Sequence, residues 1–139
     1  INAAIGLAQL RRYDSEILAK KDLINIWYKK YLEDIKGIIL PEFRTEDKVS
    51  SRHIYALRLE GATEEKRNEV IQKLAEKGIA TNVHFQPLPL LTAYKNLGFK
   101  IEDYPEAYAM YSTEISLPFH DFVSEEDVIY IANCLKEVL

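Results

Sequence analysis

Apolar residues recur along this chain at two spacings, which together predict a mixed helix and strand fold. Spacing of three to four residues predicts helices over residues 1–12, 14–35, 64–77, 90–97, 105–114 and 125–138. Period-two alternation predicts strands over residues 53–59, 79–85 and 115–117. Because the two kinds of element alternate irregularly, we expect an α/β fold of the α+β type. This would be a two-layer sandwich in which a small sheet carries helices on one side.

Capping residues mark several of these boundaries. Asp14 or Ser15 is a suitable N-cap for the long second helix, and Thr63 and Ser124 are suitable N-caps for later helices. Gly37 and Gly78 are suited to ending the helices that precede them. The long second helix has a broad apolar stripe, so we expect much of its surface to be covered.

The predicted strand over residues 79–85 carries polar side chains on one face only. Asn82 and His84 share that face, and the opposite face is formed by Ile79, Thr81, Val83 and Phe85. The proline-containing segment Pro87-Leu88-Pro89 follows. A strand end before a stiff loop suits presentation of the His84 imidazole to a ligand. From these residues alone, a hydrogen bond from His84 to neighbouring backbone is the favoured interpretation.

Composition restricts the function classes. The 139 residues are 47% hydrophobic and 29% charged, with a formal net charge of −4, as in ordinary globular domains. A mildly acidic chain without a basic block argues against nonspecific nucleic-acid binding. No apolar run approaches the ~20 residues that span a bilayer, so no membrane partner is expected. The single cysteine, Cys134, fits a reducing compartment.

Self-contained catalytic and metal motifs are not found in the sequence. The three histidines (His53, His84 and His120) lie far apart without paired ligand spacing, so no metal site is predicted. A P-loop, a nucleophile elbow and a G-x-G-x-x-G turn are absent. The chain opens on Ile1 within a helical pattern, so we expect it to be part of a longer protein that supplies further catalytic groups.

Five segments resemble, in order, the DegT-type nucleotide-sugar aminotransferases, which are fold type I pyridoxal-phosphate enzymes. Residues 1–10 (INAAIGLAQL) resemble the family's IQAAIGLxQL helix, and residues 51–55 (SRHIY) its SxHxY strand. Residues 78–88 (GIATNVHFQPL) are similar to GIxxxVHYxPL. Residues 94–99 (YKNLGF) and the pair 104–107 (YPEA) and 115–118 (ISLP) resemble the closing motifs.

The resemblance implies that the whole chain is the C-terminal small domain of such an enzyme. Residues 1–36 would form a long helical segment linking to the large domain, and residues 37–139 the α/β sandwich. The large domain would hold pyridoxal phosphate on a lysine in an SFHxxK-type motif, which this chain lacks. No catalytic residue is therefore assigned, and the chain alone is expected to be inactive.

The family's activity would be transfer of an amino group, with glutamate as the expected donor, to a keto carbon of a nucleotide-linked deoxysugar for polysaccharide or glycan synthesis. The intact enzyme would be a cytoplasmic homodimer. The resemblance makes His84, Phe85 and Asn82 candidate substrate-binding residues. Phe85 stands where the family usually has Tyr, and Pro89 where it often has a second His, so contacts through those groups are lost.

Two alternatives stay open at this stage. Some relatives resemble sugar dehydratases, in which a histidine replaces the Schiff-base lysine, and the deciding residue lies outside this sequence. A free-standing α/β ligand-binding module without enzymatic activity is the second alternative.

Overall fold

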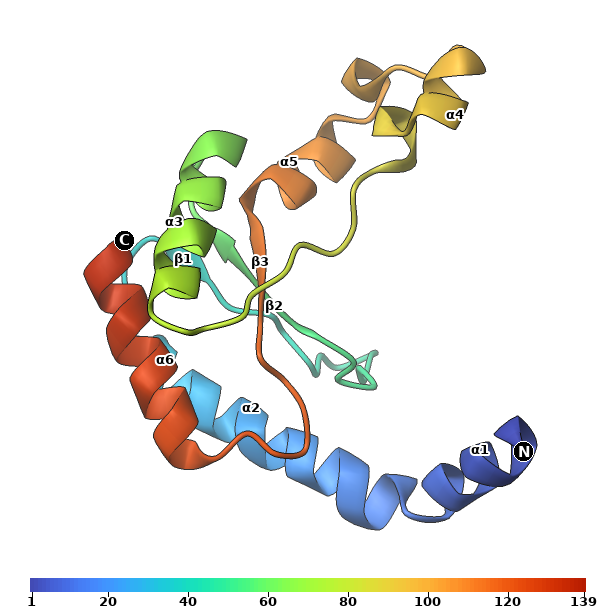
Figure 1. Ribbon diagram of the computed structural model, residues 1–139, viewed down its shortest axis with the longest axis vertical. Helices are drawn as coiled ribbons and strands as arrows, with labels where there is room; N and C mark the ends of the chain where they lie inside the picture. The colour runs from blue at the N-terminus through green and yellow to red at the C-terminus, as the bar shows by residue number, and fades with distance from the viewer.

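The computed structural model describes residues 1–139 and contains a three-stranded antiparallel sheet in the order β1-β2-β3 (Figure 1). Strand β2 pairs with β3 so that Leu57 lies opposite Ile115 and Arg58 opposite Glu114. The elements are α1 (Asn2–Arg11), a π-helical segment (Tyr13–Leu18), α2 (Ala19–Leu32), β1 (Ile38–Ile39), β2 (Tyr55–Leu59), α3 (Glu64–Glu76), a 3-10 turn (Leu88–Leu90), α4 (Thr92–Asn96), a second 3-10 turn (Ile101–Asp103), α5 (Pro105–Thr113), β3 (Glu114–Leu117) and α6 (Glu125–Val138).

The hydrophobic core lies between one face of the sheet and helices α2, α3 and α6, which gather on one side of the strands (Figure 1). On β2, buried and half-buried residues alternate, as the period-two pattern requires. The core side chains include Ile24, Tyr28 and Leu32 from α2, Tyr55, Leu57 and Leu59 from β2, Val70 and Leu74 from α3, Ile115 and Leu117 from β3, and Val128, Ile131, Leu135 and Val138 from α6. The predicted two-layer α+β sandwich is therefore confirmed.

The capping predictions for α3 and α6 are confirmed. The Thr63 side chain accepts a hydrogen bond from the Lys66 amide, and Ser124 forms a reciprocal capping box with Asp127. Gly78 follows α3 with φ of 77°, a left-handed conformation that favours glycine. These local signals determine where the two core helices start and where α3 ends.

The long second helix was predicted wrongly in its limits. Instead of one helix over residues 14–35, a π-helical segment precedes α2, and neither Asp14 nor Ser15 caps it with its side chain. α2 ends at Leu32 rather than Ile35. α1 buries no residue and extends away from the body (Figure 1), so tertiary packing does not restrain this end of the chain.

Residues 79–85 do not form the predicted strand. They run alongside β3 as an extended segment, with a single bridge between Asn82 and Ser116. The reason is that side chains take the hydrogen bonds a ladder would need. The Val83 amide donates to the Asn82 side-chain oxygen, and the His84 amide donates to the Glu114 carboxylate.

After this segment the chain leaves the body, forms α4 and returns through α5 to β3 (Figure 1). The predicted helix over residues 90–97 is a 3-10 turn followed by α4, and Gly98 follows with φ of 90°. No helix of the structure combines the length and the apolar character needed to cross a membrane.

Candidate functional site

The second face of the sheet is polar, in contrast to the face that packs on the helices. Ala56 and Arg58 of β2 lie opposite Ser116 and Glu114 of β3 on this face. We call these four residues the polar face. The extended segment 79–85, yellow-green in Figure 1, lies alongside β3 and is bridged to it between Asn82 and Ser116. This bridge brings the candidate residues Asn82 and His84 to the polar face.

Two backbone hydrogen bonds join the extended segment to β3. The Asn82 amide donates to the Ser116 carbonyl at 3.2 Å, and the Ser116 amide donates to the Asn82 carbonyl at 2.8 Å. Because the backbone amide and the backbone carbonyl of Ser116 both bond to Asn82, the segment is held in a fixed register on β3. The side chain two residues further on, His84, is therefore placed by the sheet and not by a free loop.

A chain of side-chain hydrogen bonds connects His84 to the polar face. The imidazole Nδ1 lies 2.9 Å from Ser116 Oγ, and Ser116 Oγ lies 2.5 Å from Glu114 Oε1. The other carboxylate oxygen, Oε2, accepts the His84 backbone amide at 2.8 Å. Glu114 and Ser116 are only 4% and 5% exposed. Buried polar groups in a fully connected network define one geometry, so His84 has a fixed orientation.

A cavity of about 300 Å³ opens beside this network. Its polar lining includes His53, Asn82, His84 and Ser116, and Thr81 also lines it. Asn82 Nδ2 lies 3.4 Å from His84 Nε2. Thr81 Oγ1 is buried and has no hydrogen-bond partner. The cavity therefore offers several hydrogen-bonding groups to a polar ligand.

Phe85 is the third candidate residue, and its ring projects outward. It is 76% exposed, and it makes a T-shaped contact with the His84 ring, with an interplanar angle of 77° and ring centroids 4.8 Å apart. An apolar ring this exposed is suited to packing against a ligand or another part of a larger protein. The structure thus brings Asn82, His84 and Phe85 together, and their substrate-binding role stays a prediction.

Sequence reasoning missed Glu114 and Ser116. Both alternate with the core residues Ile115 and Leu117, so the period-two pattern of this strand indicated that they share a face. Their contact with His84 spans about thirty residues of chain, and no local motif encodes it. A buried glutamate within an apolar strand was the one indication that a partner had to exist.

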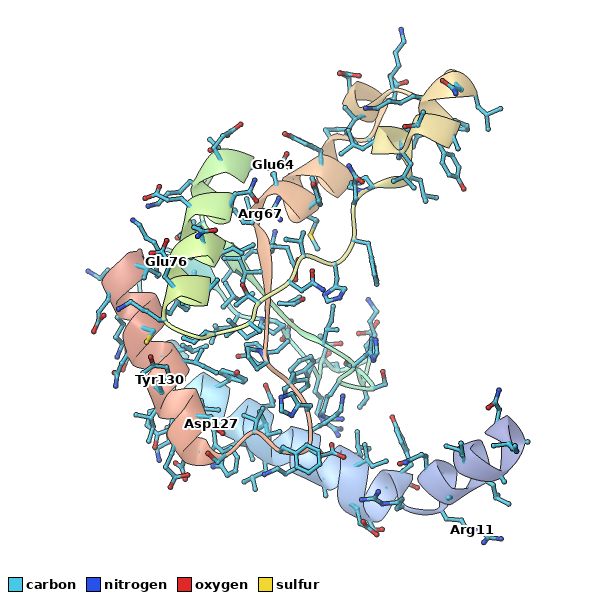
Figure 2. All side chains as sticks on the ribbon, viewed as in Figure 1. Arg11, Glu64, Arg67, Glu76, Asp127 and Tyr130 are labelled. Atoms are coloured by element: carbon cyan, nitrogen blue, oxygen red, sulfur yellow. The ribbon has the colours of Figure 1, made fainter.

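A buried arginine stabilises the end of β3 that carries Glu114. Arg67 is 1% exposed, and it lies with Glu64 on α3 where that helix meets α5 (Figure 2). Its guanidinium donates to the Glu114 carbonyl at 3.4 Å and lies 5.0 Å from the Tyr111 ring. Glu64 accepts hydrogen bonds from the hydroxyls of Tyr108 and Tyr111. These contacts join α3, α5 and β3 next to the site.

The lysine nearest the other end of the sheet is engaged with backbone. Lys21 Nζ donates to the carbonyls of Arg52 and His53 at 2.8 and 3.2 Å, and it lies over the Phe119 ring. Burial lowers the pKa of Lys21, and Asp121 opposes that effect. Its amine therefore serves the loop before β2 and does not line the cavity at His84.

The remaining histidines lie apart from the His84 network. His53 is exposed and precedes β2, which starts at Tyr55, but its side chain lines the same cavity as His84. His120 is exposed in the loop before α6 and lines a different cavity of about 540 Å³. No group of three His, Cys, Asp or Glu side chains is arranged to hold a metal ion.

Comparison with known proteins finds one consistent group of relatives. The sequence profile of the DegT/DnrJ/EryC1/StrS aminotransferase family matches residues 1–136. A solved structure described as a sugar aminotransferase from Streptococcus pneumoniae, known with PLP and with PMP, superimposes with a TM-score of 0.92 at 48% identity. The match covers 98% of this chain and 34% of that one.

Two curated relatives cover the whole chain. The spore coat polysaccharide biosynthesis protein SpsC of Bacillus subtilis is 31% identical. The UDP-4-amino-4,6-dideoxy-N-acetyl-beta-L-altrosamine transaminase of Campylobacter jejuni is 26% identical. In each case the match takes up 36% of the relative. This chain therefore spans about a third of the length of the relatives it matches.

Proposed function

This chain belongs to the DegT/DnrJ/EryC1/StrS aminotransferase family, and we propose that it acts as the C-terminal small domain of a nucleotide-sugar aminotransferase. The complete enzyme would use pyridoxal phosphate to transfer an amino group, with glutamate as donor, to a keto group of a nucleotide-linked deoxysugar. The observation that carries the proposal is the match over residues 1–136 to a family whose members are about three times as long. We propose that the enzyme is a cytoplasmic homodimer, as the family resemblance implies.

The proposed domain plan comes from the family resemblance, and the exposure of α1 supports its first part. Residues 1–36 would link to the large domain, and residues 37–139 would form the sandwich. α1 buries nothing, and its exposed Ile5 and Leu10 are available to the rest of the enzyme. The second half of the linking segment contributes Ile24, Tyr28 and Leu32 to the core, so the link would be rigid where it joins the sandwich.

The residues of this chain do not by themselves fit pyridoxal phosphate. When bound, the cofactor supplies an electron sink and needs a lysine amine for its Schiff base. The cavity at His84 is lined by no lysine and no arginine. Cofactor attachment would thus fall to another part of the enzyme, and this chain would contribute one wall of the substrate site.

In that wall, His84 would hydrogen-bond the nucleotide-sugar substrate and Asn82 would support it from the same edge. Phe85 would pack its exposed ring on an apolar part of the substrate. The support is the fixed geometry of His84 on β3 together with the adjoining cavity that His84 and Asn82 line. A preorganised polar group of this kind orients a substrate with little loss of side-chain entropy.

Replacing His84 with alanine in the complete enzyme tests this proposal. Loss of one substrate hydrogen bond with its partner left unpaired costs about 1–3 kcal/mol, so kcat/KM for the nucleotide sugar should fall about 5- to 150-fold. The cofactor absorption spectrum and the half-reaction with glutamate should not change. The matched control is His120→Ala, which removes an exposed imidazole that does not line the cavity at His84. Equal kinetics for both variants would remove His84 from the substrate site.

The aminotransferase assignment has its own test. The complete enzyme with glutamate and a nucleotide-linked keto sugar should release 2-oxoglutarate and amino sugar in equal amounts. Loss of a hydroxyl from the sugar without amino transfer would instead indicate the dehydratase alternative. Residues 1–139 mixed with pyridoxal phosphate should give no lysine-dependent visible absorption band, and such a band would contradict the assigned division of labour.

A further inference from the structure

We propose that Glu114 and Ser116 are positioning residues that keep the hydrogen of the neutral His84 imidazole on Nδ1, so that Nε2 accepts a hydrogen bond from a substrate hydroxyl that displaces the long 3.4 Å contact with Asn82 Nδ2. The inference deepens the proposed function and rests on the role given there to His84. It specifies which atom of the ring meets the substrate. It also specifies that the substrate group facing that atom is a hydrogen-bond donor, such as a sugar hydroxyl, and not a diphosphate oxygen.

The direction of the hydrogen-bond chain follows from the capacity of each group. An ionised carboxylate can only accept hydrogen bonds. Glu114 Oε2 accepts from the His84 amide, and Oε1 accepts from Ser116 Oγ, so the single hydroxyl hydrogen of Ser116 points at Glu114. The Ser116 oxygen then has only lone pairs to offer. Nδ1 of His84, 2.9 Å away, must therefore be the donor.

The other ring nitrogen agrees with this direction. With the hydrogen on Nδ1, Nε2 of a neutral imidazole carries a lone pair. The group nearest to it is Asn82 Nδ2 at 3.4 Å, an amide nitrogen that can only donate. The Asn82 side-chain oxygen is already occupied by the Val83 amide, which fixes the orientation of the amide group. The side chains on both sides of the ring thus favour one tautomer.

Burial makes the arrangement selective. Glu114 and Ser116 are shielded from water, whereas the His84 ring is only half-buried and lines the 300 Å³ cavity. A hydrogen bond between shielded groups is stronger than one in water, so reversing the chain would leave a buried oxygen or hydrogen without a partner. The buried Glu114 and Ser116 would thus set the tautomer of the His84 ring, and the accessible side of the ring would contact the substrate.

The tautomer is measurable in residues 1–139 by nitrogen NMR of protein labelled at its three histidines, at a pH where the rings are neutral. The His84 signals, assigned with His84→Gln, should show hydrogen on Nδ1. Ser116→Ala should move it to Nε2, the form that a free imidazole prefers in water. The matched control is Ser112→Ala, which removes a 7% exposed serine hydroxyl bonded to a carbonyl within α5. Hydrogen on Nε2 in the wild type, or no change in Ser116→Ala, would overturn the proposal.

A second variant keeps the test decisive if Ser116→Ala is unfolded. In Glu114→Gln, the side-chain oxygen can still accept the His84 amide while the new NH₂ group donates to Ser116. The Ser116 hydroxyl can then turn toward Nδ1, so this variant should also place the hydrogen on Nε2. Ser116→Thr, which keeps a hydroxyl, should retain hydrogen on Nδ1. Glu114→Gln with an unchanged tautomer would contradict the assigned direction of the chain.

Kinetics of the complete enzyme separate this inference from the proposed function. Ser116→Ala should raise KM for the nucleotide sugar about 5- to 10-fold, leave the glutamate half-reaction unchanged, and be restored by Ser116→Thr. If His84→Ala has no kinetic effect, the proposed function fails whatever the tautomer is. If His84→Ala is impaired but the NMR signals show hydrogen on Nε2, only the positioning role fails.

Discussion

The two faces of the β2–β3 pair differ in what stabilises them. Toward the helices, β2 and β3 present Tyr55, Leu57, Ile115 and Leu117, all nearly inaccessible to water. On the polar face the same strands present Arg58, Ala56, Glu114 and Ser116, of which only the last two are fully buried. The first face is stabilised by the removal of apolar area from water, and the second by specific hydrogen bonds. The comparison teaches that alternate residues of one strand serve apolar packing and polar hydrogen bonding.

The largest expected effect is a difference in unfolding free energy between substitutions at two adjacent residues of β2, one on each face. Leu57 has no exposed surface, so Leu57→Ala should lower the free energy of unfolding by about 2–5 kcal/mol through lost burial and a residual cavity. Arg58, on the polar face, makes no side-chain hydrogen bond or ion pair, so Arg58→Ala should cost less than about 1 kcal/mol.

Urea denaturation followed by circular dichroism measures both values under the same conditions. Tyr55 or Leu59 truncation would extend the first arm of the experiment along the same face. Similar losses for Leu57→Ala and Arg58→Ala would show that the polar face also carries packing energy, and the functional interpretation of that face would lose its basis.

The comparison of faces also explains what the sequence predicted. The pattern of Tyr55, Leu57 and Leu59 identified β2 and its buried face, because an antiparallel strand covered on one side repeats every two residues. The alternation of Ile79 to Phe85 looked the same, yet these residues make a single bridge to β3. Alternation reports which residues are covered and does not report where the backbone hydrogen bonds go.

The candidate site was predictable only in part for the same reason. His84 and Asn82 were identified from their shared polar face within one short segment. Glu114 and Ser116 belong to a strand thirty residues away, and their partnership with His84 arises from tertiary structure. The π-helical segment before α2 likewise left no recognisable signal, because Tyr13 to Leu18 contains helix-compatible residues throughout.

A smaller effect compares a buried hydroxyl that has a hydrogen-bond partner with one that has none. Tyr28 is fully buried and donates to the Pro118 carbonyl at 2.7 Å, and burial raises the pKa of its phenol. Tyr28→Phe should therefore cost about 1 kcal/mol. Thr81 Oγ1 is buried and has no partner, so Thr81→Val should be neutral or stabilise by up to about 1 kcal/mol.

Thermal or urea unfolding of the two variants checks these signs. Opposite signs would agree with one hydroxyl that stabilises the fold through its hydrogen bond and one that is buried without a partner. A clear loss of stability in Thr81→Val would show instead that the Thr81 hydroxyl has a partner in the folded protein.

The smallest expected effect is a pH-dependent contribution to stability from the helical layer. Asp127, in the first turn of α6, accepts hydrogen bonds from the Ser124 amide and hydroxyl, and these bonds lower its pKa. A carboxyl whose folded pKa is lowered stabilises the protein above the ordinary Asp value of about 3.9, and this contribution is lost as the pH falls through the folded value. Asp127→Asn should therefore be less stable than the wild type near pH 6, and the difference should vanish at low pH. Paired urea titrations at pH 6 and at a pH well below the folded pKa of Asp127 measure it, and Glu126→Gln removes a neighbouring charge of the same turn without breaking the capping box. A constant difference at both pH values would mean that the shape of the Asp127 side chain, and not its charge, supports the start of α6.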